Sequence, residues 1–122
     1  MMIGTVLELV LLDHYEGALQ LLPIITINVA FICTVILFFY KKRIIFTIFK
    51  SSLVLLIGVG VYGTFLHLKE NYQFEVEMKP TAKTFDLFLE SLSGALPSLA
   101  PLSLLAMALI GYAYLKLTKQ NL

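Results

Sequence analysis

Two histidines, and the carboxylates beside one of them, are the side chains of this sequence best suited to hold a metal ion or a cofactor. His14 lies between Asp13 and Glu16, and His67 stands at the end of a much later apolar segment. Imidazole and carboxylate groups form a metal-ligand set, and a carboxylate can also orient a ligating histidine through a hydrogen bond. Two histidines on facing helices can instead ligate haem iron. His14 and His67 are therefore candidate haem ligands, and the pair with Asp13 and Glu16 is a candidate metal site.

A competing interpretation gives these residues no ligand. Polar side chains at a membrane interface face water and lipid headgroups, and tetrahedral zinc sites usually have more closely spaced ligands than His14 and His67. From the sequence alone, three alternatives therefore stay open: a haem cofactor, a metal ion, or no cofactor. The single cysteine, Cys33, lies in an apolar segment. We expect it to be a buried, unreactive thiol.

The segment from Gly58 to Gly63 reads G-V-G-V-Y-G and matches the G-x-G-x-x-G spacing of dinucleotide-binding loops. Such a loop requires a preceding strand and a later acidic residue for the ribose, and this segment has neither because it lies within a long apolar stretch. Small residues in a membrane helix instead allow a close approach by its neighbour. We therefore predict that Gly58, Gly60, Gly63 and Thr64 form a groove for a neighbouring helix or a flat cofactor.

Asn28 is a polar residue within the first long apolar segment. Polar side chains at such depth usually face the bundle interior and bond across helices, so we predict a packing role for Asn28, with a substrate or ion path as the alternative. No ionisable residue lies deep in any of the predicted spans, which argues against a proton-coupled transporter. No serine stands in a G-x-S-x-G turn. We therefore expect no enzymatic activity.

The elements that must position these residues are membrane helices. Hydrophobic residues make up 59% of the 122 residues and charged residues 14%, against roughly 45–50% and about 25% in soluble domains. A soluble core of this size cannot hide so much apolar surface, so lipid must solvate part of it. The net charge of +1 comes without a basic stripe. We therefore expect no nucleic acid partner.

Three segments are long and apolar enough to cross the bilayer, because about 20 apolar residues in a helix span its hydrocarbon core. Helices are expected because lipid leaves unpaired backbone groups unsatisfied. The sequence thus predicts an all-α membrane protein with three transmembrane helices. It forms a single membrane domain over 1–122, divided into an interfacial segment 1–18, spans at 19–40, 50–68 and 96–115, an outer loop 69–95 and a tail 116–122.

The connecting segments carry their own patterns. The range Ile3–Leu12 is apolar but reaches only about half-way across the bilayer, so we predict an interfacial or re-entrant helix. In the outer loop, alternation over Tyr72–Met78 predicts a strand. An amphipathic helix that lies on the outer surface or caps the bundle is then predicted from apolar residues at helical spacing: Phe85, Phe88, Leu89 and Leu92.

The charges predict the orientation. Six basic residues lie in the connection between the first two spans or after the third: Lys41, Lys42, Arg43, Lys50, Lys116 and Lys119. All eight acidic residues lie on the opposite side of the predicted spans: Glu8, Asp13, Glu16, Glu70, Glu75, Glu77, Asp86 and Glu90. The positive-inside rule then places the C-terminus in the cytoplasm and the N-terminus outside, in a bacterial inner membrane.

The chain also resembles small uncharacterised bacterial integral membrane proteins with a D-H-x-E-like start. The resemblance is carried by the run from Asp13 to Gly17, by His67 at a later helix end and by the Pro-Ser-Leu-Ala-Pro stretch at 97–101. It implies no particular function or site.

The leading functional hypothesis is a non-catalytic accessory or structural subunit of a larger membrane complex, with respiratory or electron-transfer complexes as examples. Its partners would be the lipid bilayer and other membrane subunits or a second copy of the chain. A glycine groove and the absence of deep ionisable groups suit packing against partners. One alternative is a haem- or metal-binding membrane anchor that uses His14 and His67. Another is an oligomeric channel or transporter.

Overall fold

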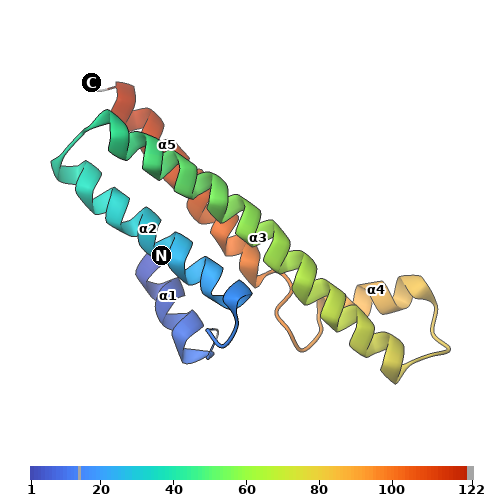
Figure 1. Ribbon diagram of the computed structural model, residues 1–122. Helices are drawn as coiled ribbons and strands as arrows, with labels where there is room; N and C mark the ends of the chain where they lie inside the picture. The colour runs from blue at the N-terminus through green and yellow to red at the C-terminus, as the bar shows by residue number, and fades with distance from the viewer. Residues whose placement is uncertain (14, 121–122) are drawn as a thin grey trace.

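Long apolar helices dominate the computed structural model of the chain, which describes residues 1–13 and 15–120 (Figure 1). Three segments are long and apolar enough to cross a membrane: Ala18–Phe39, Arg43–Met78 and Ala100–Thr118. The predicted all-α membrane fold is therefore confirmed. In chain order the elements are α1 (Met2–Leu11), α2 (Ala18–Phe39), α3 (Arg43–Met78), α4 (Thr84–Leu92), a 3₁₀ turn (Ala100–Leu102) and α5 (Ser103–Gln120).

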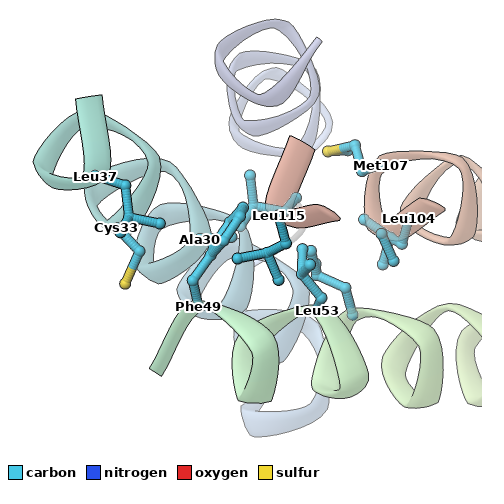
Figure 2. Close-up of a cluster of buried hydrophobic side chains, with 11 residues drawn as sticks. Ala30, Cys33, Leu37, Phe49, Leu53, Leu104, Met107 and Leu115 are labelled. Carbon is cyan, nitrogen blue, oxygen red and sulfur yellow. The ribbon is translucent and has the colours of Figure 1, made fainter. Parts of the chain in front are cut away.

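The core lies where α2 and α5 pack against the first half of α3. Each helix contributes one apolar face at helical spacing, and Figure 2 shows these side chains meeting between the three ribbons. The Phe49 ring packs edge-to-face against the Tyr114 ring, with 6.3 Å between centroids. Cys33 is a buried free thiol in this core. The buried cluster comprises Ile27, Ala30, Cys33, Leu37, Phe49, Leu53, Leu56, Leu104, Met107, Ala108 and Leu115.

Helix α1 packs on the bundle through one of its faces, and its interfacial or re-entrant placement in the membrane stays a prediction. The helix runs back along α2, and the start of the chain lies beside the middle of α2 (Figure 1). Met2, Val6 and Leu9 pack against the core, but no residue of α1 is fully buried. A helix of ten residues is about 15 Å long, so α1 covers only one half of the bundle.

Helix α3 continues to Met78, so the predicted strand over Tyr72–Met78 is wrong. The burial follows one face of a helix. Asn71 is buried, and Tyr72 and Glu75, which come one and four residues after it, are half-buried. A strand would also need a neighbouring strand to satisfy its backbone, and the described residues contain none.

Two predicted span boundaries also differ from the structure. Helix α3 begins at Arg43 rather than at Lys50, because Lys50 lies exposed on the helix side and a long basic side chain can reach the interface without ending a helix. Regular structure before α5 begins at Ala100 rather than at 96, because Pro101 favours the 3₁₀ turn in which it lies. The predicted tail from 116 is helical as far as Gln120.

The two ends of the molecule differ. At one end lies a hairpin, which we define as the end of α3 from Lys69 to Met78, the turn 79–83, α4 and the loop 93–99. We call this the hairpin end. The opposite end, where α2 turns into α3 through Lys41 and Lys42, is the basic end. A 36-residue helix such as α3 is about 54 Å long, while the hydrocarbon core is about 30 Å thick. The hairpin therefore projects from the bundle, as Figure 1 shows.

Candidate functional site

One asparagine holds the two arms of the hairpin together. Asn71 is 4% exposed, and its Nδ2 donates to the carbonyl oxygens of Ser91 at 3.0 Å and Leu96 at 2.7 Å. The same Nδ2 lies 2.8 Å from the Ser98 hydroxyl oxygen, and Asn71 Oδ1 accepts from the Leu96 N–H at 3.0 Å. One side chain on α3 thereby fixes the end of α4 and the loop that leads into α5.

Two buried serines complete this polar node, which we define as Asn71, Ser91 and Ser98. The Ser98 hydroxyl donates to the Ser91 carbonyl at 3.2 Å, and the Ser91 hydroxyl donates to the Phe88 carbonyl at 2.6 Å. Within residues 1–13 and 15–120, no buried side-chain nitrogen or oxygen lacks a hydrogen-bond partner. Because both hydroxyls already donate, the node is built to hold backbone segments together rather than to supply a nucleophile.

Gly94 allows this close arrangement. A Cβ atom at Gly94 would lie 2.7 Å from both Nδ2 and Oδ1 of Asn71. Real Cβ atoms do not approach polar atoms so closely, so the loop can pass over the amide only without a side chain there. Gly94 lies in the predicted outer loop 69–95, but the sequence gave no sign that Asn71 would lie beneath it.

The predicted histidine site is described only in part. His67 is half-buried, and its Nδ1 lies 3.2 Å from the Pro97 carbonyl oxygen. This places His67 beside the loop 93–99, close in sequence to the polar node. His14 lies outside the described residues, so its pairing with His67 stays a prediction.

The carboxylates near His14 face outward. Asp13 and Glu16 are both exposed, and Asp13 accepts a 2.8 Å hydrogen bond from the Tyr15 hydroxyl. That bond raises the pKa of Tyr15 above its ordinary value. In the part of the chain that the structure describes, no three His, Cys, Asp or Glu side chains come together to hold a metal ion.

The predicted glycine groove is real on one face of α3 and absent on the other. A Cβ on Gly60 would lie 2.5 Å from Leu105 Cδ1 and 2.8 Å from the Pro101 carbonyl oxygen, and a Cβ on Gly63 would lie 3.1 Å from Pro101 Cβ. Gly58 has nothing within 4 Å of its Cβ position. At 3.6 residues per turn, Gly58 and Gly60 face nearly opposite directions, so including Gly58 in the groove was wrong.

Thr64 and Gly111 are two further small residues of α3 and α5 near this contact. Thr64 is half-buried, and its hydroxyl donates to the Gly60 carbonyl of its own helix at 2.9 Å. Gly111 on α5 was missed by the sequence analysis, although a Cβ there would lie 2.5 Å from Leu53 Cδ2. The sequence has no second glycine at helical spacing from Gly111, so no small-residue motif pointed to it.

Asn28 does not bond across helices. It is exposed, and its Nδ2 donates to the Ile24 carbonyl one turn back in α2 at 2.8 Å. It lines an apolar cavity of about 270 Å³ in which the facing residues of α1 are all apolar, among them Val6 and Val10. Since α1 offers no polar side chain there, the amide turns to its own backbone, which asparagine commonly does. The predicted packing bond was wrong for this reason.

An ion pair closes the tip of the hairpin. The Lys79 Nζ lies 2.6 Å from Glu90 Oε2 and 3.4 Å from Glu75 Oε2. The hydrogen bond to Glu90 raises the pKa of Lys79, and the same bond lowers the pKa of Glu90. Lys79 follows α3 and Glu90 lies on α4, so the pair joins the two arms of the hairpin.

We expect this pair to tighten the hairpin only at intermediate pH. The contribution of Glu90 is present above about pH 4.3 and is lost as the pH falls through its lowered pKa, while that of Lys79 is present below about pH 10.4 and is lost as the pH rises through its raised pKa. The measurement is the distance distribution between nitroxide labels at positions 77 and 86, which should broaden at both extremes. Glu90→Gln should broaden it at neutral pH and remove the acid transition, and an unchanged distribution would contradict the role of the pair.

The comparisons with known proteins give no relative from which a role could be transferred: no family model, no curated protein and no solved structure matches this chain.

Proposed function

We propose that this chain is a non-catalytic subunit of a larger membrane assembly and that the hairpin is its docking element. The supporting observation is the apolar stripe of α4, defined as Phe85, Phe88, Leu89 and Leu92. These residues recur at the spacing of one helix face, yet they are 68%, 43%, 47% and 38% exposed. Helix α4 packs through its other face instead, where Leu87 and Ser91 are buried.

An exposed apolar stripe outside the membrane span requires a cover. The hairpin is fixed by the polar node and by the pair of Lys79 and Glu90, so α4 cannot simply turn its stripe inward without breaking those bonds. A rigid frame that presents aromatic and aliphatic side chains is typical of protein-binding surfaces, because little ordering is needed on binding. A partner subunit therefore suits the stripe.

The spanning helices also leave surface for neighbours. In the most apolar stretch of each spanning helix, few residues are buried within this chain. The buried share is 33% in α2, 28% in α3 and 28% in the segment Ala100–Thr118. The remainder faces lipid or other helices, and three helices are too few to enclose a transport path alone. The six basic residues toward the basic end favour an arrangement with that end in the cytoplasm of a bacterial cell and the hairpin outside.

The test is co-purification from native membranes in mild detergent, followed by quantitative mass spectrometry. We expect partner chains at fixed stoichiometry with the wild-type protein. The double variant Phe85→Ser/Leu89→Ser should lower their yield by about tenfold or more, because two exposed anchors of an interface are removed. Asp86→Ser changes an exposed residue between them on α4 and should keep the partners.

Two results would contradict the proposal. One is a stable monomer without partners in every mild detergent. The other is equal partner recovery with the stripe variant and the control, since the stripe would then carry no binding energy. The folded state of the stripe variant is checked by its helical circular dichroism and its thermal unfolding.

A haem- or metal-binding anchor is the second candidate, and one contact favours it. A histidine that ligates a metal usually donates its other ring N–H to a carbonyl or carboxylate, and the Pro97 carbonyl lies 3.2 Å from His67 Nδ1 in that manner. The test is the absorption spectrum and metal content of the purified protein. A Soret band that disappears in both His14→Ala and His67→Ala supports the anchor, and a colourless, metal-free protein contradicts it.

A further inference from the structure

We infer that one exposed face of α3 binds an anionic phospholipid, with the lipid phosphate beside Arg43 and Lys50 and an acyl chain along the apolar turns that follow. The face begins at the basic end of the molecule, away from the hairpin. The lipid site is therefore separate from the docking surface of the proposed subunit, and either can exist without the other.

The exposed face of α3 runs along about six turns of the helix. Each residue of an α-helix is rotated by about 100° from the one before it, so residues three or four positions apart point in similar directions. Every residue of this face is exposed, so no helix that the structure describes covers it. The face comprises Arg43, Thr47, Lys50, Val54, Ile57, Val61 and Phe65.

The side chains of this face follow the same order as the parts of a phospholipid. Two basic residues, with the small side chain of Thr47 between them, occupy roughly the first two turns. From Val54 to Phe65 the face is apolar. A phospholipid carries its phosphate at the membrane surface and its chains below, so one molecule matches both parts of the face. An apolar partner helix would match only the lower part.

The contact between Phe49 and Tyr114 gives the level of Lys50 in the bilayer. The two rings pack with 6.3 Å between their centroids, so Lys50 lies at the level of Tyr114 and Lys116 on α5. Tyrosine concentrates at the headgroup level of membrane proteins. Cα–Cβ bonds tilt toward the helix N-terminus, and α3 begins at the basic end. The long Lys50 side chain therefore extends toward the headgroups rather than toward the bilayer centre.

The basic residues of this face have no counter-charge within the chain. The sequence contains no Asp or Glu in the ranges 17–69 and 91–122. Among the described residues neither Arg43 nor Lys50 forms an ion pair, since both ion pairs found there belong to Lys79. The start of α3 has no side-chain cap, so its first backbone N–H groups add partial positive charge. A lipid phosphate supplies the negative charge that this end lacks.

Gly58 leaves room for the acyl chain on this face. It lies next to Ile57, one turn beyond Val54, and nothing lies within 4 Å of its Cβ position. Its distance from Lys50 is about 12 Å along the helix, within the roughly 15 Å that the chains of one leaflet occupy. A hydrocarbon chain can therefore lie against the bare backbone between the side chains of Val54 and Val61.

The test uses tryptophan fluorescence, because the chain contains no tryptophan of its own. A single reporter, Ile57→Trp, is placed on the face, and the full chain is reconstituted in phosphatidylcholine vesicles. A fixed fraction of brominated lipid, either anionic phosphatidylglycerol or phosphatidylcholine, then quenches the reporter according to its occupancy of the site. We expect phosphatidylglycerol to bind at least about fivefold more tightly, the effect of one basic residue near an anionic headgroup. Arg43→Gln combined with Lys50→Gln should abolish this preference.

A second pair of substitutions separates a site from the general attraction of basic residues. Lys41→Gln combined with Lys116→Gln removes the same charge from the same end but not from this face. Lys41 precedes α3, and the Lys116 Nζ lies 5.5 Å from the centroid of the Tyr112 ring. The preference for phosphatidylglycerol should persist in this variant.

A second reporter controls for depth. Ala106→Trp is exposed on α5, eight residues before Tyr114. Ile57 lies eight residues after Phe49, the ring that packs against Tyr114, so both reporters sample the same depth. The reporter on α5 should show no lipid preference. Equal preference at both reporters, or equal loss in the two charge variants, would overturn the site, because the attraction would then belong to the whole basic end. Protection of the Ile57 reporter from both brominated lipids would also overturn it, because a protein neighbour would then cover the face.

Discussion

Replacement of Asn71 by leucine is expected to detach α4 and the loop 93–99 from α3 and to lower the free energy of unfolding by about 3–4 kcal/mol. The asparagine makes three short contacts through Nδ2 and accepts one bond through Oδ1. Each hydrogen bond contributes about 1 kcal/mol, and each buried carbonyl or N–H left unpaired costs about 1–3 kcal/mol. Leucine branches at the same position as asparagine and is larger, so the substitution leaves no empty space, and the loss reflects the missing hydrogen bonds and the crowding by two methyl groups.

Hydrogen exchange over residues 84–99 and thermal unfolding in detergent are the measurements for the Asn71 variant. Exchange in the hairpin should accelerate more than exchange in α2, because the lost bonds lie at one end of the molecule. Asn28→Leu is the matched control, since Asn28 is exposed and bonds only to its own helix. Equal effects of the two substitutions would mean that the polar node does not hold the hairpin.

Gly94→Ala tests the same node without touching its hydrogen-bonding groups. The added methyl group would overlap the amide of Asn71, so we expect the same local acceleration of exchange with a smaller loss of stability, about 1–3 kcal/mol. Ala95→Ser, at the exposed neighbouring position, should leave both measurements unchanged.

Gly60→Ala is expected to separate α3 from the start of α5 and to lower the free energy of unfolding by about 1–3 kcal/mol. The new Cβ would lie 2.8 Å from the Pro101 carbonyl oxygen and 2.5 Å from Leu105 Cδ1. The leucine side chain can rotate away, but the carbonyl belongs to the backbone of Pro101, so relief requires the two helices to move apart. The measurement is unfolding in detergent, followed by helical circular dichroism.

Gly58→Ala is the control that the chain itself offers. It lies two residues away in the same helix, with nothing within 4 Å of its Cβ position. Alanine favours a helix over glycine by up to about 1 kcal/mol, so this variant should be neutral or slightly more stable. If Gly58→Ala were the more damaging of the two, the contact between α3 and α5 would not be as described.

The amino-acid sequence determined the features that depend on composition and chain direction. A run of about 20 apolar residues can be stable only in lipid or in a core, so three spanning helices followed from the sequence and were found. The separation of six basic residues from the acidic ones is likewise a property of the chain, as is the amphipathic spacing that predicted α4. These features are local, because each depends on neighbours along one helix.

The tertiary structure decided which polar and small residues meet. Asn71 lay directly before a segment whose alternation predicted a strand, and only the approach of α4 and the loop 93–99 made it the centre of the polar node. Gly58 and Gly60 look alike in the sequence, yet α5 packs on one side of α3 and so needs only Gly60. Asn28 looked suited to a bond across helices and met an apolar helix instead. Such contacts depend on how helices are rotated against one another, and the free energy that selects a rotation is summed over the whole interface, so no single residue or motif reveals it.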